Sequence, residues 1–133
     1  MDISEFPLTW RWTQSSHAKL PDHILTELQP LDLQSVLLLT NNIPSVLVAD
    51  FSRFVADNDD TTRQWLMQLD ISSPRVIVVW RADLALSMPW TTFCQYWDDF
   101  CYPSSDNADI FLECGRLFLR WRHYEVFECD PEL

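Results

Sequence analysis

The stretch IFLECGRLFLRWRHYEVFE, residues 110–128, decides the fold that this sequence predicts. Gly115 and Arg116 in its first half suit a type II′ turn of two residues, which requires glycine in the first position. With that turn, apolar residues face each other across a hairpin: Cys114 and Leu117, Leu112 and Leu119, and Ile110 and Trp121. The pattern therefore predicts a hairpin with one fully apolar face.

The second half of the stretch favours a further hairpin, closed at Arg122 and His123. The facing residues would be Arg120 with Glu125 and Phe118 with Phe127. Such cross-strand pairs each stabilise a sheet by about 0.2–1 kcal/mol, and a slip of one residue would lose both. Because neither residue of this turn favours a positive φ, a longer loop is the alternative. We therefore predict a three-stranded antiparallel meander over residues 110–128.

Two more strands are expected before the meander. RVIVVW, residues 75–80, is a continuous run rich in β-branched residues, which is typical of a strand buried on both faces. Residues 84–87 favour a short returning strand. Trp10 and Trp12 stand two positions apart, which indicates a short strand or an extended arm. Residues 45–56 fit a strand or a helix, and periodicity does not decide between them.

Helical spacing of apolar residues predicts four helices. The first begins at Pro21 and stops at Pro30, the second covers residues 31–39, and the third begins at Thr61 after a cap within residues 57–60. The fourth, ended by Pro103, carries an inward apolar stripe of Trp90, Phe93, Cys94, Trp97, Phe100 and Cys101. These elements predict a single α+β domain, residues 1–133, with helices packed on one face of a mainly antiparallel sheet.

Several classes of site are excluded by what the sequence lacks. Gly115 is the only glycine, so no phosphate-binding glycine loop, dinucleotide fingerprint or GxSxG elbow is present. The run DNDDTT, residues 57–62, resembles the start of a calcium loop but lacks its glycine, and Gln68 stands where the bidentate glutamate belongs. No CxxC or HExxH spacing for zinc occurs. We therefore expect no cofactor and no metal.

The cysteines leave one catalytic alternative open. Cys94, Cys101, Cys114 and Cys129 are expected to be free thiols in a reducing compartment, and those on the apolar helix stripe to be inert. A small enzyme or metal-binding protein using His123, Cys129 and a nearby carboxylate is the alternative to a non-catalytic protein. Whether any cysteine is reactive stays open.

The charge of the chain restricts its partners. Nine basic and twenty acidic side chains give a net charge of −11. Nucleic acid and anionic membranes would repel such a protein, whereas a basic protein would be attracted to it. The N-terminus lacks the pattern of a signal peptide and no run of eighteen apolar residues occurs, so we expect a cytoplasmic location.

A partner-binding site is expected at the end of the fourth helix. Its candidate residues are Asp98, Asp99, Tyr102 and Asp106. Carboxylates can steer a basic partner while an aromatic ring supplies contact energy. The alternative is an ordinary solvated helix face. Adjacent Asp98 and Asp99 diverge by about 100° on a helix, so they do not form a paired acid–base site.

A resemblance to known proteins rests on three parts of the sequence: LPDHILTELQPL (residues 20–31), the spacing W-x2-F-x3-W-x2-F followed by CYPSSDN (residues 90–107), and RHYEVFE (residues 122–128). They resemble small acidic bacterial proteins of unknown function, some of which are similar to immunity proteins that neutralise toxins. The resemblance implies binding to a basic toxin and assigns no catalytic residue. It does not extend to residues 42–60.

Overall fold

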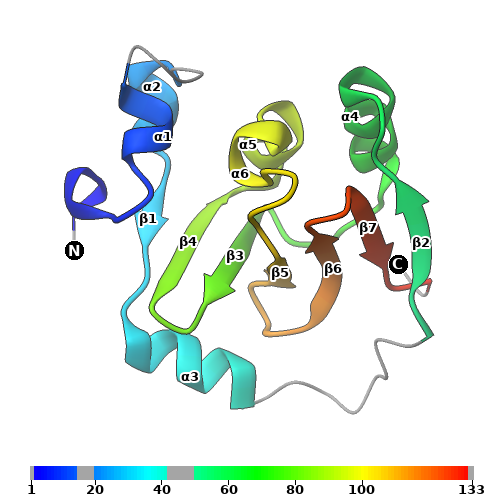
Figure 1. Cartoon of the computed structure of the whole chain (residues 1–133). Helices are drawn as coiled ribbons and strands as arrows, with labels where there is room; N and C mark the ends of the chain where they lie inside the picture. The colour runs from blue at the N-terminus through cyan, green and yellow to red at the C-terminus, as the bar shows by residue number, and fades with distance from the viewer. Residues whose placement is uncertain (1, 15–19, 42–49, 132–133) are drawn as a thin grey trace.

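The computed structural model describes residues 2–14, 20–41 and 50–131, and Figure 1 shows how its helices and strands are arranged. The strands are β1 (Gln29–Pro30), β2 (Ser52–Val55), β3 (Arg75–Arg81), β4 (Leu84–Pro89), β5 (Ala108–Leu112), β6 (Leu117–Arg122) and β7 (Val126–Cys129). The helices are a 3-10 turn η1 (Ile3–Glu5), α1 (Trp10–Thr13), α2 (Asp22–Leu25), α3 (Leu33–Asn41), α4 (Asp59–Gln68), α5 (Trp90–Gln95) and α6 (Trp97–Phe100). Within the described ranges the strands form one seven-stranded antiparallel sheet, in the order β1-β4-β3-β5-β6-β7-β2. The predicted α+β fold is confirmed.

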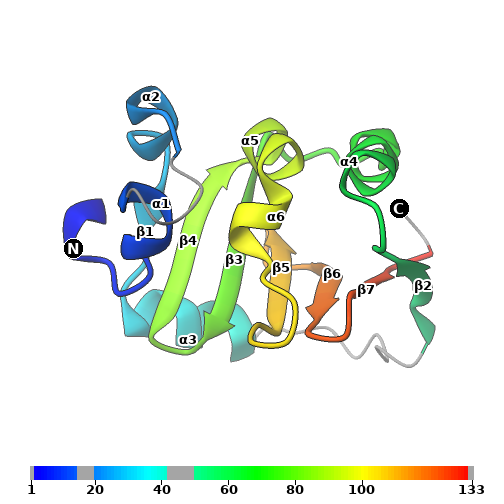
Figure 2. The ribbon, with the colours of Figure 1, turned by 45° about the horizontal axis from the view of Figure 1, so that its top comes forward.

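Helices cover both faces of this sheet (Figure 2). The larger core lies on the face that packs against α1, α2, α4, α5 and α6, and it contains the cross-strand neighbours Val78, Ile110 and Leu119. On the opposite face, Val36 of α3 packs with a smaller set, Val79, Ala85, Phe111 and Leu117. The expectation of helices on one face is therefore wrong for α3. Consecutive side chains of β3 pack alternately into the larger and the smaller core, so both faces of this strand are buried. This explains why its apolar residues form a continuous run.

The first hairpin of the meander is present, but its register differs from the predicted one. Ile110 pairs with Leu119 rather than with Trp121, and the register shifts again before Phe111. The shift from Trp121 to Leu119 is two residues, so Ile110, Leu112, Leu119 and Trp121 still face the larger core. Leu117 instead packs in the smaller core and Cys114 is exposed, so the prediction of one fully apolar face is wrong at the turn end of the hairpin. The loop covers residues 113–116 and is longer than a two-residue turn. Gly115 adopts a φ of 95° there, so the glycine does occupy a backbone position that disfavours other residues.

The second hairpin closes with the longer loop, residues 123–125. Glu125 has a φ of 65° and its N–H donates to the carbonyl of Arg122 at 3.0 Å. The loop moves the register, so that Trp121 faces Phe127 with ring centroids 4.9 Å apart. The predicted pairs, Phe118 with Phe127 and Arg120 with Glu125, are therefore wrong. The aromatic cross-strand contact is kept with a different partner.

The predicted fourth helix is divided into α5 and α6. Tyr96 breaks it with φ −118° and ψ 27°, outside the helical range. The apolar stripe is nevertheless confirmed, since every member is at most 9% exposed: Trp90, Phe93, Cys94, Trp97, Phe100 and Cys101. The chain leaves α6 at Phe100, three residues before Pro103.

The N-terminal tryptophans lie on a helix, not on a strand. Both belong to α1, in which Trp12 is fully buried and stacks on Phe6 at 6.3 Å, while Trp10 is exposed. The expectation of a short strand or extended arm is therefore wrong. Of the ambiguous segment 45–56, residues 52–55 form the edge strand β2 and residues 45–49 lie outside the described part.

The first predicted helix is shorter than expected: only Asp22–Leu25 are helical (α2), and Gln29–Pro30, expected at its end, pair with β4 as the edge strand β1. The second and third predicted helices are confirmed as α3 and α4. The last begins at Asp59, two residues earlier than expected, because the Asn58 side chain accepts the Thr61 N–H at 2.9 Å and caps the helix. In α3, Leu33 and Leu37 are exposed, although their spacing with Val36 resembles a buried face. None of the described helices is long and apolar enough to cross a bilayer.

Candidate partner-binding surface

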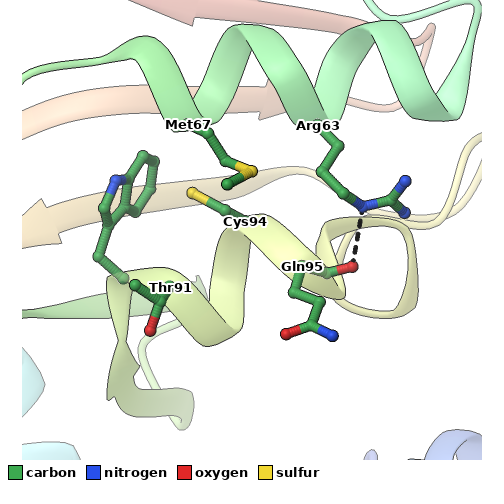
Figure 3. Close-up of a pocket in the computed structure, with 6 residues that line it drawn as sticks. Arg63, Met67, Thr91, Cys94 and Gln95 are labelled. Carbon is green, nitrogen blue, oxygen red and sulfur yellow. Dashed lines mark hydrogen bonds between the residues drawn. The ribbon is translucent and has the colours of Figure 1, made fainter.

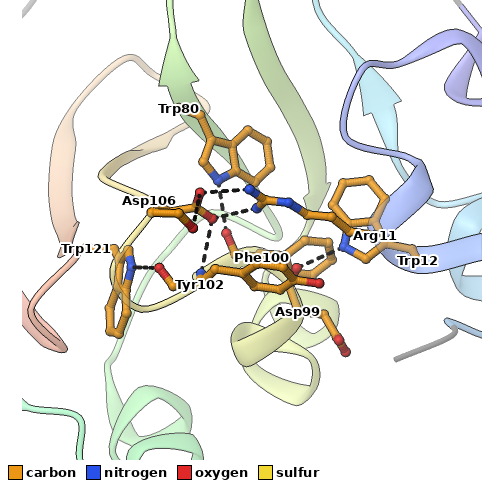
Figure 4. Close-up of polar contacts among 9 residues, drawn as sticks. Arg11, Trp12, Trp80, Asp99, Phe100, Tyr102, Asp106 and Trp121 are labelled. Atoms are coloured by element: carbon orange, nitrogen blue, oxygen red, sulfur yellow. Dashed lines mark hydrogen bonds and ion pairs between the residues drawn. The ribbon is translucent and has the colours of Figure 1, made fainter. Parts of the chain in front are cut away.

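Asp106 forms a buried ion pair with Arg11 (Figure 4). The Arg11 Nη1 lies 2.6 Å from Asp106 Oδ2 and its Nη2 lies 2.9 Å from Oδ1, a bidentate geometry. Asp106 also accepts the backbone N–H of Tyr102 at 3.1 Å and is only 6% exposed. The carboxylate therefore ties the loop after α6 to helix α1 and does not face solvent.

Tryptophan ring N–H groups hold the same loop from three sides (Figure 4). The bonds run from Trp12 to the Asp99 carbonyl at 2.8 Å, from Trp80 to the Phe100 carbonyl at 2.9 Å, and from Trp121 to the Tyr102 carbonyl at 3.3 Å. Carbonyls in the last turn of a helix lack N–H donors within it, so the ring N–H groups of Trp12 and Trp80 supply the missing bonds at the end of α6. The abundance of tryptophan, a residue whose N–H needs a partner when buried, is the sequence signal for this arrangement.

Tyr102 is half-buried beneath the same arginine. The Arg11 guanidinium carbon lies 4.2 Å from the centre of the Tyr102 ring, a cation–π contact. Burial raises the pKa of the Tyr102 phenol, and the Arg11 charge partly opposes that rise. The phenol is therefore neutral at physiological pH, and part of its ring remains available at the surface.

Asp99 and Asp98 differ in how they meet solvent. Asp99 is 9% exposed, and burial, followed by the charge of Asp98, raises its pKa to about 6. The Asp98 side chain is 42% exposed and its Oδ1 lies 3.7 Å from Arg63 Nη2. Burial raises the Asp98 pKa as well, and the neighbouring charge of Asp59 acts in the same direction. Of the two, Asp98 is the carboxylate that a partner can reach.

Two carboxylates of α4 join Asp98 at the surface. Asp59 and Asp60 occupy the first turn of that helix, and Arg63 Nη1 contacts Asp60 Oδ1 at 2.8 Å. The Trp97 ring N–H of α6 donates to the Asp59 carbonyl at 3.2 Å, which brings the two helices together. We call Asp59, Asp60 and Asp98 the acidic face. Sequence reasoning treated Asp59 and Asp60 only as helix caps, because nothing in their spacing indicates contact with a helix 38 residues away.

The residues of the catalytic alternative lie apart. His123 is exposed in the β6–β7 loop, where its Nδ1 lies 3.1 Å from Asn107 Oδ1. Cys129 is buried at the far end of β7, about 10 Å along the strand from the loop. Burial raises its pKa to about 11, so it is a thiol at neutral pH. In the part of the chain that the structure describes, no three His, Cys, Asp or Glu side chains are placed to hold a metal ion.

Comparison of the chain with protein-family models, with curated proteins and with solved structures gives no match. The resemblance to small acidic bacterial proteins therefore stays a prediction from the residues.

Proposed function

We propose that this chain is a non-catalytic acidic protein that binds a basic protein partner, as an immunity-type inhibitor binds a basic toxin. The observation that supports it is that the arginine side chains are already bonded to other groups within the chain. Every arginine of the chain already bonds to another group within it, so its guanidinium does not stand free on the surface. Six arginines bond to a carboxylate, in the pairs Arg11–Asp106, Arg63–Asp60, Arg81–Asp83, Arg116–Asp130, Arg120–Asp109 and Arg122–Glu128. Arg53 instead donates to the Tyr124 hydroxyl, and Arg75 donates to the Ser87 hydroxyl and the Glu27 carbonyl.

The acidic face is the surface we assign to this contact. Its three carboxylates come from two helices: Asp60 and Asp98 contact Arg63, and the charge of Asp59 acts on Asp98. A basic partner approaching there gains attraction before contact, which raises the association rate more than the affinity. Tyr102 contributes contact area from the neighbouring loop. Of the four residues expected from sequence, Asp98 and Tyr102 carry the proposal, whereas Asp99 is mostly covered and Asp106 supports the loop from within.

The test compares two triple variants that remove the same charge. Asp59→Asn, Asp60→Asn and Asp98→Asn neutralise the acidic face, and Asp22→Asn, Asp50→Asn and Glu125→Gln neutralise three exposed carboxylates elsewhere. Asp106 is left unchanged because its replacement would perturb folding. The native protein is immobilised, its partner is captured from extract of the source cells and identified, and association is then followed by stopped flow over a salt titration.

We expect the captured partner to be basic and its association to slow steeply as salt rises. The acidic-face triple should lower the association rate constant by about tenfold at low salt, and the control triple by less than about twofold. Equal slowing by both triples would mean that the net charge acts without a localised surface. A neutral or acidic partner, or association that does not respond to salt, would contradict the proposed function.

A further inference from the structure

A pocket of about 250 Å³ opens between α4 and α5, beside the acidic face (Figure 3). It is lined by Arg63, Met67, Trp90, Thr91, Cys94 and Gln95. Figure 3 shows the sulfur atoms of Met67 and Cys94 directed toward each other between the two helices. Sites that enclose a whole drug-sized ligand measure about 300–1,000 Å³, so this smaller pocket suits one side chain of a larger molecule.

The lining of the pocket is mostly apolar. The Met67 thioether is polarizable and adaptable, and this residue is 66% exposed, the largest exposed fraction among the big apolar side chains of the described part. Burial raises the pKa of Cys94 to about 12, so its thiol is neutral and behaves as a small apolar group. Exposing such a surface is unfavourable in water, and covering it releases that free energy.

Arg63 connects the pocket to the acidic face. Its Nε donates to the Gln95 carbonyl at 3.0 Å, while its Nη atoms contact Asp60 and Asp98. Two hydrogen bonds and one longer ion pair, to Asp98, hold the guanidinium against α5, the start of α4 and α6. An apolar hollow thus lies directly next to carboxylates, an arrangement in which apolar contact supplies affinity and the surrounding charges select the partner.

We propose that this pocket receives an apolar side chain, of the size of leucine or methionine, from a segment of a basic protein in which lysine or arginine flanks that residue. The proposal rests on the proposed function and adds the anchor by which the partner is held. The apolar side chain enters between α4 and α5 while the flanking cations reach Asp59, Asp60 and Asp98. An anionic membrane or nucleic acid has the wrong charge for the same rim.

Short peptides test the pocket without the natural partner. The probes are the capped peptides KKLKK, KKAKK and EELEE, added to protein labelled with 13C at the methionine methyl groups. The Met67 methyl reports on the pocket, and the Met88 methyl, fully buried in the core, is the control within the same molecule. We expect KKLKK to shift Met67 with a dissociation constant in the millimolar range and to leave Met88 unmoved.

The matched peptides and variants decide the outcome. KKAKK should bind at least about tenfold more weakly because it buries less apolar surface, and EELEE should cause no shift. Thr91→Trp, at an exposed position on the pocket wall, should abolish the shift, whereas Gln34→Trp, exposed on α3, should not. Absence of any Met67 shift, equal binding of KKAKK, or equal binding of EELEE would each overturn the inference.

Kinetics with the natural partner can test this inference separately from the proposed function. If a basic partner is slowed by the acidic-face triple but dissociates from Thr91→Trp at the unchanged rate, the binding function stands and the pocket is not its anchor. An increase of about tenfold or more in the dissociation rate constant of Thr91→Trp, with the association rate constant kept within about twofold, supports the anchor. If no basic partner exists, the proposed function fails whatever the peptides do.

Discussion

The buried pair between Arg11 and Asp106 gives the most demanding prediction. Arg11 is only 7% exposed, so in Asp106→Asn a buried guanidinium loses its counter-charge. Its Nε already has no hydrogen-bond partner among the described residues, and the cation–π contact with Tyr102 does not replace a counter-charge. Removing one partner of a buried pair costs about 3–5 kcal/mol, a large part of the roughly 5–15 kcal/mol that stabilises a domain. We expect the lower end, about 3 kcal/mol, because the asparagine oxygen can still accept from Tyr102 N–H.

The measurement is urea unfolding at pH 7 followed by tryptophan fluorescence, with Asp109→Asn as the matched control. Asp109 pairs with Arg120 at 2.6 Å, but both side chains are at least one-quarter exposed, so its loss should cost less than about 1 kcal/mol. In the double variant Arg11→Met with Asp106→Asn both charges are gone, and we expect it to be at least about 2 kcal/mol more stable than the sum of the single losses predicts. Additive losses, or a cost below about 1 kcal/mol for Asp106→Asn, would refute this reasoning.

Three further predictions concern single side chains. The pKa of Asp99 is raised from 3.8 to about 6, so the folded state binds more protons between these values and stability falls as pH rises through them. Asp99→Asn should therefore remove that fall and raise the free energy of unfolding at pH 7 by about 1–3 kcal/mol in urea titrations, and an unchanged pH profile would contradict it. Gly115→Ala should cost about 1–3 kcal/mol in the same assay through its φ of 95° alone, since the added Cβ would meet Leu39 Cδ1 at an ordinary 3.5 Å. A thiol reagent at pH 7.5 should label Cys114, the exposed cysteine, in folded protein and all four cysteines in denaturant, and rapid labelling of Cys129 would instead revive the catalytic alternative.

The strands could be predicted from sequence better than their pairing. The run at residues 75–80 and the alternation after residue 110 are local patterns, and burial alone explains them. The registers depend on loop backbones: a positive φ at Glu125 and a four-residue loop around Gly115. A glutamate seldom adopts a positive φ, so no turn rule selects it, and a change of loop length moves every pair beyond it.

The N-terminal helix and the candidate site depended on contacts between distant residues. Trp10 and Trp12 share only four residues of helix, too few for a helical period to be visible, and Trp12 is fixed by contacts to Phe6 and the Asp99 carbonyl. Arg11 and Asp106 are 95 residues apart, so nothing in the sequence indicates that their side chains are in contact. A cluster of acidic residues in a sequence therefore mixes carboxylates that face solvent with carboxylates that hold the fold.

That division changes what the net charge means for binding. At physiological ionic strength charges separated by more than about 8 Å are largely screened, so the total of −11 acts on a partner only from afar and weakly. Close to contact, the charges that matter are those gathered at one place. The acidic face holds three carboxylates and one guanidinium, which contacts Asp60 and Asp98, so two net negative charges remain beside an apolar pocket. Recognition of a basic partner is thus expected to depend on Asp59, Asp60 and Asp98 far more than on an equal number of carboxylates elsewhere, and this is the difference that the two triple variants measure.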